Sequence, residues 1–587
     1  MKRIPTPYSL LFILFIDSIA FSDIIPKDRR INWTPGIPES IERSETVDVM
    51  SFGAIGDGVT DDSDAFIKAV GSLPDHGVLY IPAGTYLIKK SLSISKGILL
   101  QGEGSENTRL LFDLGCRGDN CIDFVKYDRG NWINVLEESQ KGSRIITVEK
   151  SGCFSSGDFV QIQQDNDPEL MYTRDDWRES WAENAVGQIL IVEEVKGDTL
   201  VLQRPLNITY RLELNPQVRT LGLITYPGVE DLYIERLDAG DGHTIQMRYV
   251  AYASVQRVES NMTFRSHIYI AESCACQVRN NYIHHAHDYG GGGHGYGIDI
   301  IRHSTDCLVI DNVFKYLRHS MMTHVGTSGN VYAYNYSTER EPQRLCDISL
   351  HGHYSNANLF EGNVVEEIHV SDYWGPIGPR NTFLRNVITR EGIDINDYSH
   401  GQNLVGNTLL RGRRITVHSS VENTLLHGNT VNDNTQWDPE ISDRDIPTSY
   451  FLEEKPDFLE GYPWPLSGPD VETIHKLPAQ LRYERGQPIT GIEKKGSLLP
   501  QDYSLQAYPN PFNPQTTLRF ELPREEHITV RVYTIDGRRL TTLIEEKLAK
   551  GTYEIPFRPQ ADQSSGVFFI QLQTGSRRWV EKITFLK

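Results

Sequence analysis

An asparagine recurs at nearly constant spacing through the middle of this 587-residue chain. The repeated segments combine apolar strand residues with a final asparagine: CQVRNN, CLVIDN, VYAYN, NLFEGN, NTFLRN, NLVGN and TLLHGN, ending at Asn281, Asn312, Asn335, Asn363, Asn386, Asn407 and Asn429. The successive spacings are 31, 23, 28, 23, 21 and 22 residues. Such a period is typical of a parallel β-helix, in which stacked amide side chains hydrogen-bond along the axis. The two long spacings require loop insertions.

The first part of the chain contains VDVMSFGAIGDGVTDDSDAFIKAV and then GVLYIPAGTYLIKKSLSISKGILLQGEGSENTRLLF. Helix-capping side chains at Thr60 to Asp64 precede an apolar helical pattern, and short alternating strands follow. This arrangement resembles the N-terminal part of the pectate-lyase-like superfamily of right-handed parallel β-helices, which includes rhamnogalacturonase-type hydrolases, polysaccharide lyases and uronate epimerases. The resemblance implies an all-β fold with a β-helix over residues 45–435, and a structural role for Asp57, Asp61 and Asp62.

The N-terminus and the charge indicate where the protein works. Lys2 and Arg3 precede the apolar run LLFILFI, and small residues follow, so we predict a signal peptide over residues 1–22. No later stretch is long enough to span a bilayer, so no transmembrane segment is expected in the mature chain. The net charge of −20, from 58 Lys+Arg against 78 Asp+Glu, argues against nucleic acid as a partner.

Three further regions flank or interrupt the repeat. Residues from about 130 to 215 predict an inserted β subdomain whose Trp-rich loop could border a substrate groove. Residues 436–500 are rich in proline and charge and are predicted to be a linker. Alternation at Ile528, Val530 and Val532 predicts a C-terminal Ig-like β-sandwich over residues 501–587. That segment resembles the C-terminal sorting domain of type IX secretion, which implies the secretion machinery as a partner and a secreted or outer-surface location.

Seven cysteines are too few for a disulfide scaffold in a chain of this size. Cys116 and Cys121 are close enough in sequence to pair, and Cys276 is a candidate partner of Cys307. An odd cysteine must remain in any pairing.

Aligning the coils on their asparagines places one set of polar residues on an outward face. Alternate strand residues face opposite sides, and equivalent positions on successive coils form columns about 4.8 Å apart. With the β-branched and leucine residues of GIDI, ISLHGH, IHVS, GIDIN and ITVH pointing inward, and Val325 inward in RHSMMTHV, the polar ones point outward. The candidate catalytic residues are Asp299, Arg318, His324, His351 and His353.

A glycine run accompanies this face. Gly290 to Gly293 would let a loop pass close to the face without blocking it and deliver His294 and Tyr296 to its rim. By strand parity Tyr296 is equally compatible with an interior position. The remaining candidate substrate-binding residues are His369, Tyr373, Trp374 and Asp394.

The histidines also raise the question of a metal. His351 and His353 share one face of a strand, with His324 one coil away, but no standard zinc spacing is present. No metal ligands are therefore assigned and no cofactor is certain. Calcium, which many lyases of the resembled fold use, stays open, although the candidate face has no compact carboxylate cluster.

A long β-helix groove suits an extended polymer, so we predict a polysaccharide substrate. Elimination from a uronate needs a positive group for the developing enolate, a base for the proton at C5 and an acid for the leaving oxygen. Arg318 fits the first role, and His324, His351 or Tyr296 fit the others. The sequence therefore favours a polysaccharide lyase.

Two alternatives remain. Asp299 and Asp394 leave room for hydrolysis by an acid/base pair, as in a polygalacturonase- or rhamnogalacturonase-like glycoside hydrolase. A non-catalytic surface glycan-binding protein or adhesin is the second. The net charge of −20 requires any groove for a polyanion to be locally basic.

Overall fold

The structure is a computed structural model that describes residues 24–171, 180–341, 346–371, 375–410, 412–489, 504–508, 510–522, 526–535, 537–548, 551–559, 563–574 and 578–587. The predicted signal peptide lies outside the described residues. The chain divides into two compact units, residues 1–490 and 491–587. Among the helices of the described residues, none combines the length and the apolar character that a membrane crossing requires.

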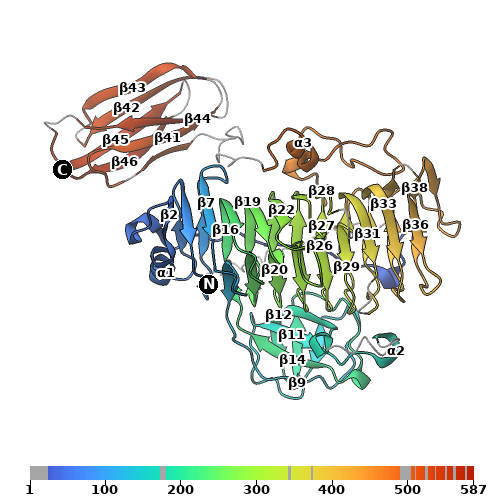
Figure 1. Cartoon of the computed structure of the whole chain (residues 1–587). Helices are drawn as coiled ribbons and strands as arrows, with labels where there is room; N and C mark the ends of the chain where they lie inside the picture. The colour runs from blue at the N-terminus through green and yellow to red at the C-terminus, as the bar shows by residue number, and fades with distance from the viewer. Residues whose placement is uncertain are drawn as a thin grey trace, which may run out of the picture. The chain divides into compact units, whose positions relative to one another are not determined.

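The first unit is a right-handed parallel β-helix with three faces, as the sequence predicted (Figure 1). The first face contains β1 (Thr46–Asp48), β3 (Val78–Tyr80), β6 (Leu99–Gln101), the start of β16 (Gly228–Arg236), the start of β19 (Ser254–Thr263), β21 (Gln277–Arg279), β24 (Leu308–Ile310), β27 (Val331–Ala333), β30 (Leu359–Glu361), β32 (Thr382–Leu384), β34 (Asn403–Val405) and β37 (Leu425–His427).

The second face begins at β2 (Asp57–Asp61) and continues through β4 (Gly84–Ile88), β7 (Thr108–Phe112), the ends of β16 and β19, β22 (Tyr282–Ala286), β25 (Val313–Lys315), β28 (Tyr336–Thr338), the start of β31 (Val364–Val370), the start of β33 (Val387–Ile395), β35 (Thr408–Leu409) and β38 (Asn429–Val431). A short antiparallel strand, β39 (Asn434–Gln436), ends it.

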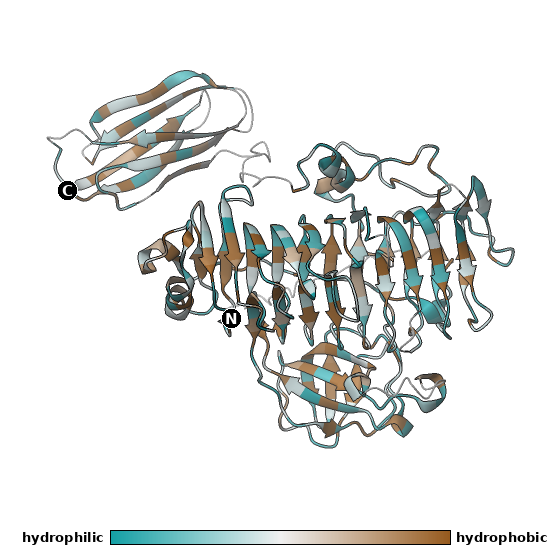
Figure 2. Cartoon of the chain, in the orientation of Figure 1, coloured by the Kyte–Doolittle hydropathy of each residue, from teal (hydrophilic) through white to brown (hydrophobic). Residues whose placement is uncertain are grey.

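The third face carries the outward residues singled out by the sequence. It contains β5 (Leu92–Ile94), β8 (Ile122–Val125), β17 (Ile245–Arg248), β20 (Ser266–Ala271), β23 (Tyr296–Ile301), β26 (His319–His324), β29 (Ile348–Leu350), the ends of β31 and β33, and β36 (Arg414–Val417). Hydrophobic segments recur on successive strands of the β-helix (Figure 2). They fill one long interior core that includes Ile298, Ile348, Ile368 and Ile393.

The asparagine repeat forms the predicted ladder inside the β-helix. Each buried asparagine donates from its side-chain amide to the side-chain oxygen of the next, as in Asn335 to Asn363 and Asn363 to Asn386, at 3.0 and 2.9 Å. The ladder runs without a break from Asn281 to Asn429. A second ladder, which the repeat did not reveal, joins Asn330, Asn358, Asn381 and Gln402.

The N-terminal cap is built as the resemblance implied. Helix α1 (Ser63–Ser72) covers the end of the β-helix core with the side chains of Ala65, Phe66 and Ala69. The Asp62 carboxylate accepts hydrogen bonds from the backbone amides of Ile55 and Gly56 at 2.7 and 3.2 Å. The aspartates of this motif therefore hold backbone turns, which is a structural role.

The inserted β subdomain is a six-stranded antiparallel sheet in the order β10-β13-β12-β11-β14-β9. Its strands are β9 (Ile133–Asn134), β10 (Ile145–Thr147), β11 (Phe159–Gln163), β12 (Gly187–Lys196), β13 (Thr199–Leu202) and β14 (Gln217–Leu221), with the one-turn helix α2 (Pro168–Met171) in the long loop. Its core continues into outward residues of the third face, including Ile301 and Val325. Val325, predicted to point inward, instead packs in this core because its left-handed φ of 53° turns it away from the β-helix interior.

The structure corrects the predicted linker over residues 436–500. The described part, residues 437–489, packs along the first face through buried Ile446, Tyr450 and Leu459, and ends in helix α3 (Pro478–Glu484). Buried Arg385 donates to the carbonyls of Ile446 and Ser467 at 2.6 and 2.7 Å and so fixes the segment. The proline and charge content predicted a linker, but a few widely spaced apolar side chains are buried against the first face and hold the segment there.

The second unit is a β-sandwich of two antiparallel sheets. One contains β40 (Ser504–Tyr508), β41 (Thr516–Leu522) and β44 (Gly551–Phe557), and the other β43 (Arg539–Leu548), β42 (Glu526–Thr534), β45 (Gly566–Gln573) and β46 (Arg578–Phe585). Ile528, Val530 and Val532 are fully buried in its core, as their alternation predicted.

All seven cysteines are free thiols, so neither suggested disulfide is present. Cys276 and Cys307 do occupy equivalent positions on adjacent coils, since Gln277 pairs with Leu308. Both are buried, and both thiols hydrogen-bond weakly to nearby backbone carbonyls, of Cys274 and Thr305.

The ladder predicts a large cost for removing one asparagine from its middle. Asn363→Ala deletes an acceptor for the backbone and side-chain amides of Asn335 and a donor to Asn386, leaving buried polar groups unpaired. We expect a loss of about 3 kcal/mol in the free energy of unfolding, measured by urea denaturation. Asn434→Ala, at an exposed position beyond the ladder, is the control and should change it little. An equal small effect for both variants would show that the ladder contributes no stability.

Glu361 predicts a pH effect on stability. It is fully buried and accepts hydrogen bonds from the Tyr334 hydroxyl and the Tyr450 backbone amide, and burial raises its pKa to about 7. A raised carboxyl pKa favours the folded state at low pH, and that contribution is lost as the pH rises through about 7. Relative to Glu361→Gln, the wild type should lose on the order of 3 kcal/mol between pH 4 and pH 8 in chemical unfolding. A stability difference between the wild type and Glu361→Gln that does not change with pH would refute this prediction.

Candidate active site

A pocket of about 400 Å³ opens on the third face beside the inserted subdomain. Strands β20, β23 and β26 form its floor in consecutive register, and His243 before β17 and His351 after β29 flank them. Its lining combines aromatic and titratable side chains: Trp181, His243, Arg265, Tyr269, Gly292, Gly293, Tyr296, Asp299, Ile301, Met322, His324 and His351. The outward face predicted from the coil alignment therefore borders a concave, largely buried site.

His324 and Asp299 form the central polar pair of this pocket. Asp299 faces outward between inward Ile298 and Ile300, and His324 lies on the next coil, in register with Ile301. Their Nε2 and Oδ1 atoms are 3.2 Å apart, with side chains 13% and 7% exposed. Within the described residues, the buried Nδ1 atom of His324 has no hydrogen-bond partner. A proton on Nε2 would therefore leave the Nδ1 lone pair facing a water-poor space.

The two predicted histidines of the next coil have different surroundings. The His351 ring lies 5.9 Å from the His324 ring, lines the pocket, and has its pKa lowered well below the ordinary value by burial. His353 adopts a left-handed φ of 49° and packs against Trp181, with 4.5 Å between ring centroids. Burial lowers the pKa of His353 to about 3. Both imidazoles are neutral near pH 7.

Tyr296 and Arg318 lie side by side at the start of β23 and β26. The Tyr296 hydroxyl accepts a hydrogen bond from the Gly293 backbone amide at 2.8 Å, and burial raises the pKa of this tyrosine. The Arg318 guanidinium carbon is 6.0 Å from the Tyr296 ring centre, and Nη1 donates to the Tyr289 carbonyl at 3.3 Å. Arg318 is 9% exposed, and no carboxylate of the described residues pairs with it.

The glycine loop reaches the pocket, as the sequence predicted. Gly292 and Gly293 line it, and Gly293 adopts a left-handed φ of 86°. A Cβ atom at Gly293 would lie 3.0 Å from Arg265 Nη1, so a side chain there would crowd the pocket wall. Of the two positions that strand parity allowed for Tyr296, the side chain takes the one in the pocket lining and not the one in the interior core.

Arg318 and His353 do not line the pocket, although each contacts a lining residue, Tyr296 and Trp181 respectively. The remaining predicted residues do not line it either. His294 lies beside it and is held by Asp288, with 2.6 Å between Nδ1 and Oδ2. His369 pairs with Glu367 at 2.7 Å, two coils beyond Met322. Asp394 pairs with His418 at 3.1 Å at an exposed position. Tyr373 and Trp374 lie outside the described residues.

Six lining residues were not predicted as site residues: the apolar Ile301 and Met322, and four aromatic or charged ones, Tyr269, Trp181, His243 and Arg265. Tyr269 is outward by the same alternation as Asp299, since Ile268 and Ile270 are buried, so the alignment could have found it. Trp181 comes from the inserted loop that the sequence analysis placed beside a groove. His243 and Arg265 stand at turns, where strand alternation carries no information. His243 stacks on Tyr269 at 4.2 Å, and burial lowers its pKa to about 4.

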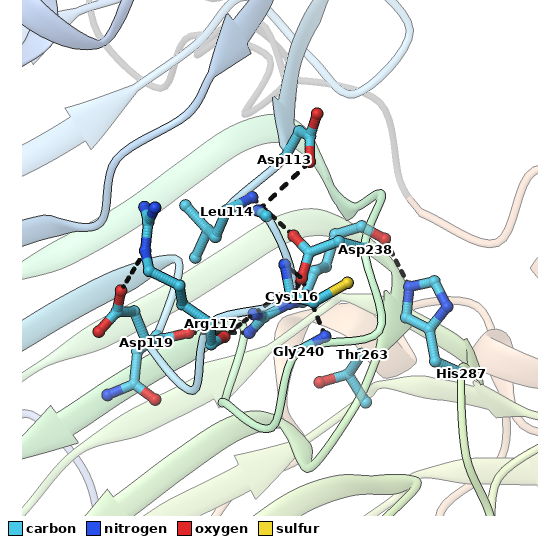
Figure 3. A network of polar contacts seen from close by, with 12 residues as sticks. Asp113, Leu114, Cys116, Arg117, Asp119, Asp238, Gly240, Thr263 and His287 are labelled. Atoms are coloured by element: carbon cyan, nitrogen blue, oxygen red, sulfur yellow. Dashed lines mark hydrogen bonds and ion pairs between the residues drawn. The ribbon is translucent and has the colours of Figure 1, made fainter.

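A buried ion pair, Arg236–Asp238, anchors the turn that carries His243. Figure 3 shows Asp238 in its network of polar contacts with Leu114, Cys116 and Gly240. The Asp238 carboxylate accepts from the backbone amides of Leu114, Cys116 and Gly240 at 2.6, 3.0 and 2.9 Å. The fully buried Arg236 donates to Asp238 and to the Arg117 and Asp119 carbonyls. Burial opposes ionisation of Asp238, but these amides and the guanidinium lower its pKa. The turn before β17 is thereby fixed.

Within the described ranges, no group of three or more His, Cys, Asp or Glu side chains is arranged to hold a metal ion. The pocket lining contains one carboxylate, Asp299, whereas calcium takes several oxygen ligands. The described residues of the pocket therefore do not fit a calcium site.

Two separate segments of the chain are similar to known protein families. Residues 46–167 match the family model "Rhamnogalacturonase A/epimerase, pectate lyase-like", and residues 506–585 match the model "Secretion system C-terminal sorting domain". The probable rhamnogalacturonase C of Aspergillus niger is 27% identical over 131 residues, 20% of this chain and 28% of that protein. The pre-neck appendage protein of Bacillus phage B103 is 37% identical over 87 residues, 14% of this chain and 10% of that protein.

The chain therefore spans less than a third of the length of these curated relatives. Among solved structures, the tailspike protein gp49 from Pseudomonas phage LKA1 has a TM-score of 0.49 and 18% identity, covering 62% of this chain and 64% of that one. The sorting domain indicates secretion and attachment at the cell surface. Residues 46–167 are thus similar to the pectate-lyase-like rhamnogalacturonase A/epimerase family, and residues 506–585 to secretion system C-terminal sorting domains.

Proposed function

We propose that this secreted protein is a polysaccharide lyase that cleaves a uronate-containing glycan by β-elimination in the pocket of the third face. The observation that carries the proposal is the His324–Asp299 pair, which lies with Tyr296 in a buried pocket whose described lining has one carboxylate. Elimination needs a base and an acid but no second carboxylate and no water. This lining meets that requirement.

His324 is assigned as the base. With the Nε2 proton donated to Asp299, Nδ1 is the free basic atom; it is buried in this structure and must be uncovered when substrate binds. It then accepts the proton from C5 of the uronate, and Asp299 stabilises the imidazolium that forms. The C5–H electrons form the C4–C5 double bond as the bond from C4 to the glycosidic oxygen breaks. Asp299 acts through His324 and is a positioning residue.

Tyr296 is assigned as the acid. Its hydroxyl oxygen accepts the Gly293 amide, so its own proton is available to the leaving oxygen, and its raised pKa keeps that proton in place at neutral pH. Arg318 lies beside Tyr296, just outside the pocket lining, and has no described carboxylate partner. We assign it to pair with the substrate carboxylate and to stabilise the enolate formed during proton removal. Neutral His351 adds a donor at the same wall.

The geometry weakens the two-carboxylate route to hydrolysis. Asp299 and Asp394 occupy one column, but Met322, Ser349 and His369 lie between them. Four strand spacings separate the two aspartates by roughly 19 Å. An acid/base pair of an inverting hydrolase is about 6.5–9.5 Å apart. Hydrolysis would therefore need a different second carboxylate.

A glycoside hydrolase stays the second candidate because one matched relative is named a rhamnogalacturonase. Asp299 would then serve as an acid with a partner other than Asp394. A non-catalytic glycan-binding protein is the third, and buried titratable groups that pair at the pocket count against it.

The test is an absorbance assay for new carbon–carbon double bonds with a panel of polyuronates, run beside a reducing-end assay. The wild type should produce both signals on at least one polyuronate. His324→Asn and Tyr296→Phe should each lower kcat by about 10²–10⁴-fold, the usual contribution of an acid or base. Reducing ends without new double bonds would indicate hydrolysis and overturn the lyase proposal.

The chain supplies its own matched control. His418 and Asp394 repeat the His324–Asp299 arrangement, with 3.1 Å between Nε2 and Oδ2, but their side chains are 43% and 35% exposed. His418→Asn should leave kcat unchanged. An equal loss in His418→Asn and His324→Asn would show that the assay reports general damage and not the base.

A further inference from the structure

Four arginines gather beside the pocket, where the third face meets the inserted subdomain. Arg129, Arg248 and Arg302 follow or end the strands β8, β17 and β23, and Arg219 projects from β14 of the subdomain. An exposed aromatic ring, Tyr127, lies among them. These five residues are called the arginine patch.

Three of these guanidinium groups have neutral hydrogen-bond partners in the described residues. Arg129 Nη1 donates to the Tyr249 hydroxyl at 2.9 Å. Arg219 donates twice to the Gln161 side-chain oxygen, at 2.9 and 2.7 Å. Arg302 Nη2 donates to the carbonyl of Trp181 at 2.5 Å, a residue that lines the pocket. These contacts orient the guanidinium groups without neutralising them.

One buried carboxylate lies among the four arginines. Glu272 is 4% exposed and pairs with Arg248 at 2.6 Å. Burial opposes its ionisation, but the charges of Arg248 and Arg302 contribute to a lowered pKa. Nearby Lys126 and Asp128 pair with each other at 3.0 Å and so add no net charge. Asp123, half-buried on β8, also interacts with the charge of Arg248, so four positive groups face two carboxylates and leave a local positive excess on a chain whose net charge is −20.

Tyr127 gives the arginine patch a platform for a sugar ring. It is 63% exposed, and the guanidinium carbons of Arg129 and Arg248 lie 5.8 and 5.7 Å from its ring centre. Exposed aromatic rings bury the apolar face of a ligand at little entropic cost. Flanking guanidinium groups supply paired donors for an acidic oxygen group.

The patch runs along the β-helix axis. Val125, Arg248, Ala271 and Ile301 are in register on four consecutive coils, so Tyr127 and Arg302 follow strands three spacings, or roughly 14 Å, apart. At one end it joins the pocket, since Ile301, Trp181 and Tyr269 line the pocket and Arg302 bonds Trp181. A chain that lies along the axis in the pocket therefore continues over the patch.

We propose that the arginine patch is a second binding site, which holds an acidic sugar of the same polysaccharide several residues away from the cleavage position. This inference rests on the proposed function only for the identity of the polymer. The shared chemistry is a sugar ring bearing an anionic oxygen group, and carboxylate is the assignment the proposed function implies. A neutral glycan gains nothing from the guanidinium groups.

The test measures binding by isothermal titration calorimetry to the full chain carrying His324→Asn, which prevents turnover. The probes are long polygalacturonate, its fully methyl-esterified form, dextran sulfate and neutral dextran. Adding Arg129→Gln should weaken binding of polygalacturonate about tenfold, because a charge-assisted hydrogen bond to the acidic group is lost. Adding Tyr127→Ala should weaken it by a similar factor, because the ring that the sugar packs against is removed. Tyr127→Phe should retain most of the affinity. Arg390→Gln, at a half-exposed arginine paired with Glu366, is the matched control and should change nothing.

The outcomes separate this inference from the proposed function. Equal binding by the patch variants and Arg390→Gln overturns the patch, even where the absorbance assay detects elimination. Weaker polygalacturonate binding in the patch variants, without any elimination by the wild type, keeps the patch and overturns the lyase. Tighter, patch-dependent binding of dextran sulfate keeps the acidic-sugar site and replaces carboxylate with sulfate. Equal binding of methyl-esterified and acidic polygalacturonate overturns the proposal that the arginine patch binds an acidic sugar.

Discussion

The spacing of parallel strands is the constraint on which this structure depends. Each coil lies one hydrogen-bonded strand above the last, so a residue's place along the axis and its inward or outward direction are both set by register. The asparagine ladder from Asn281 to Asn429 enforces that register because each side-chain oxygen accepts two hydrogen bonds from the preceding asparagine, and a slipped coil would break both. In the interior, Tyr332, Phe360 and Phe383 stack at 4.9 Å with the same periodicity.

This regularity explains why so much of the site could be predicted. Asp299, His324 and His351 were found because alternation and a repeat suffice to place outward residues on neighbouring coils. Sequence-based prediction fails at residues where the strand alternation ends. His353 departs from the alternation because of a left-handed φ, and Val325 turns toward the inserted subdomain for the same reason. His243 and Arg265 stand at turns, and their positions follow from long-range contacts such as the Arg236–Asp238 anchor, which no local pattern encodes.

Composition was the weaker guide. The proline-rich segment over residues 437–489 packs on the first face because a few apolar side chains, spaced without a period, find a shared surface there. The net charge of −20 likewise does not predict whether the protein binds a polyanion, because binding depends on the charges close to the site. The arginine patch gathers four guanidinium groups around two carboxylates on a surface that averages out as acidic.

The duplicated histidine–aspartate pair shows how a solenoid separates geometry from chemistry. The repeat places a histidine two residues past the register partner of an aspartate in both Asp299–His324 and Asp394–His418, with contacts of 3.2 and 3.1 Å. Only the first has Trp181 and the inserted subdomain beside it. In water the second pair is screened by a high dielectric, whereas the first interacts in a medium where the same charges have several times the energy. A β-helix can therefore acquire or lose an active site by gaining or losing a neighbouring loop, while its coils remain unchanged.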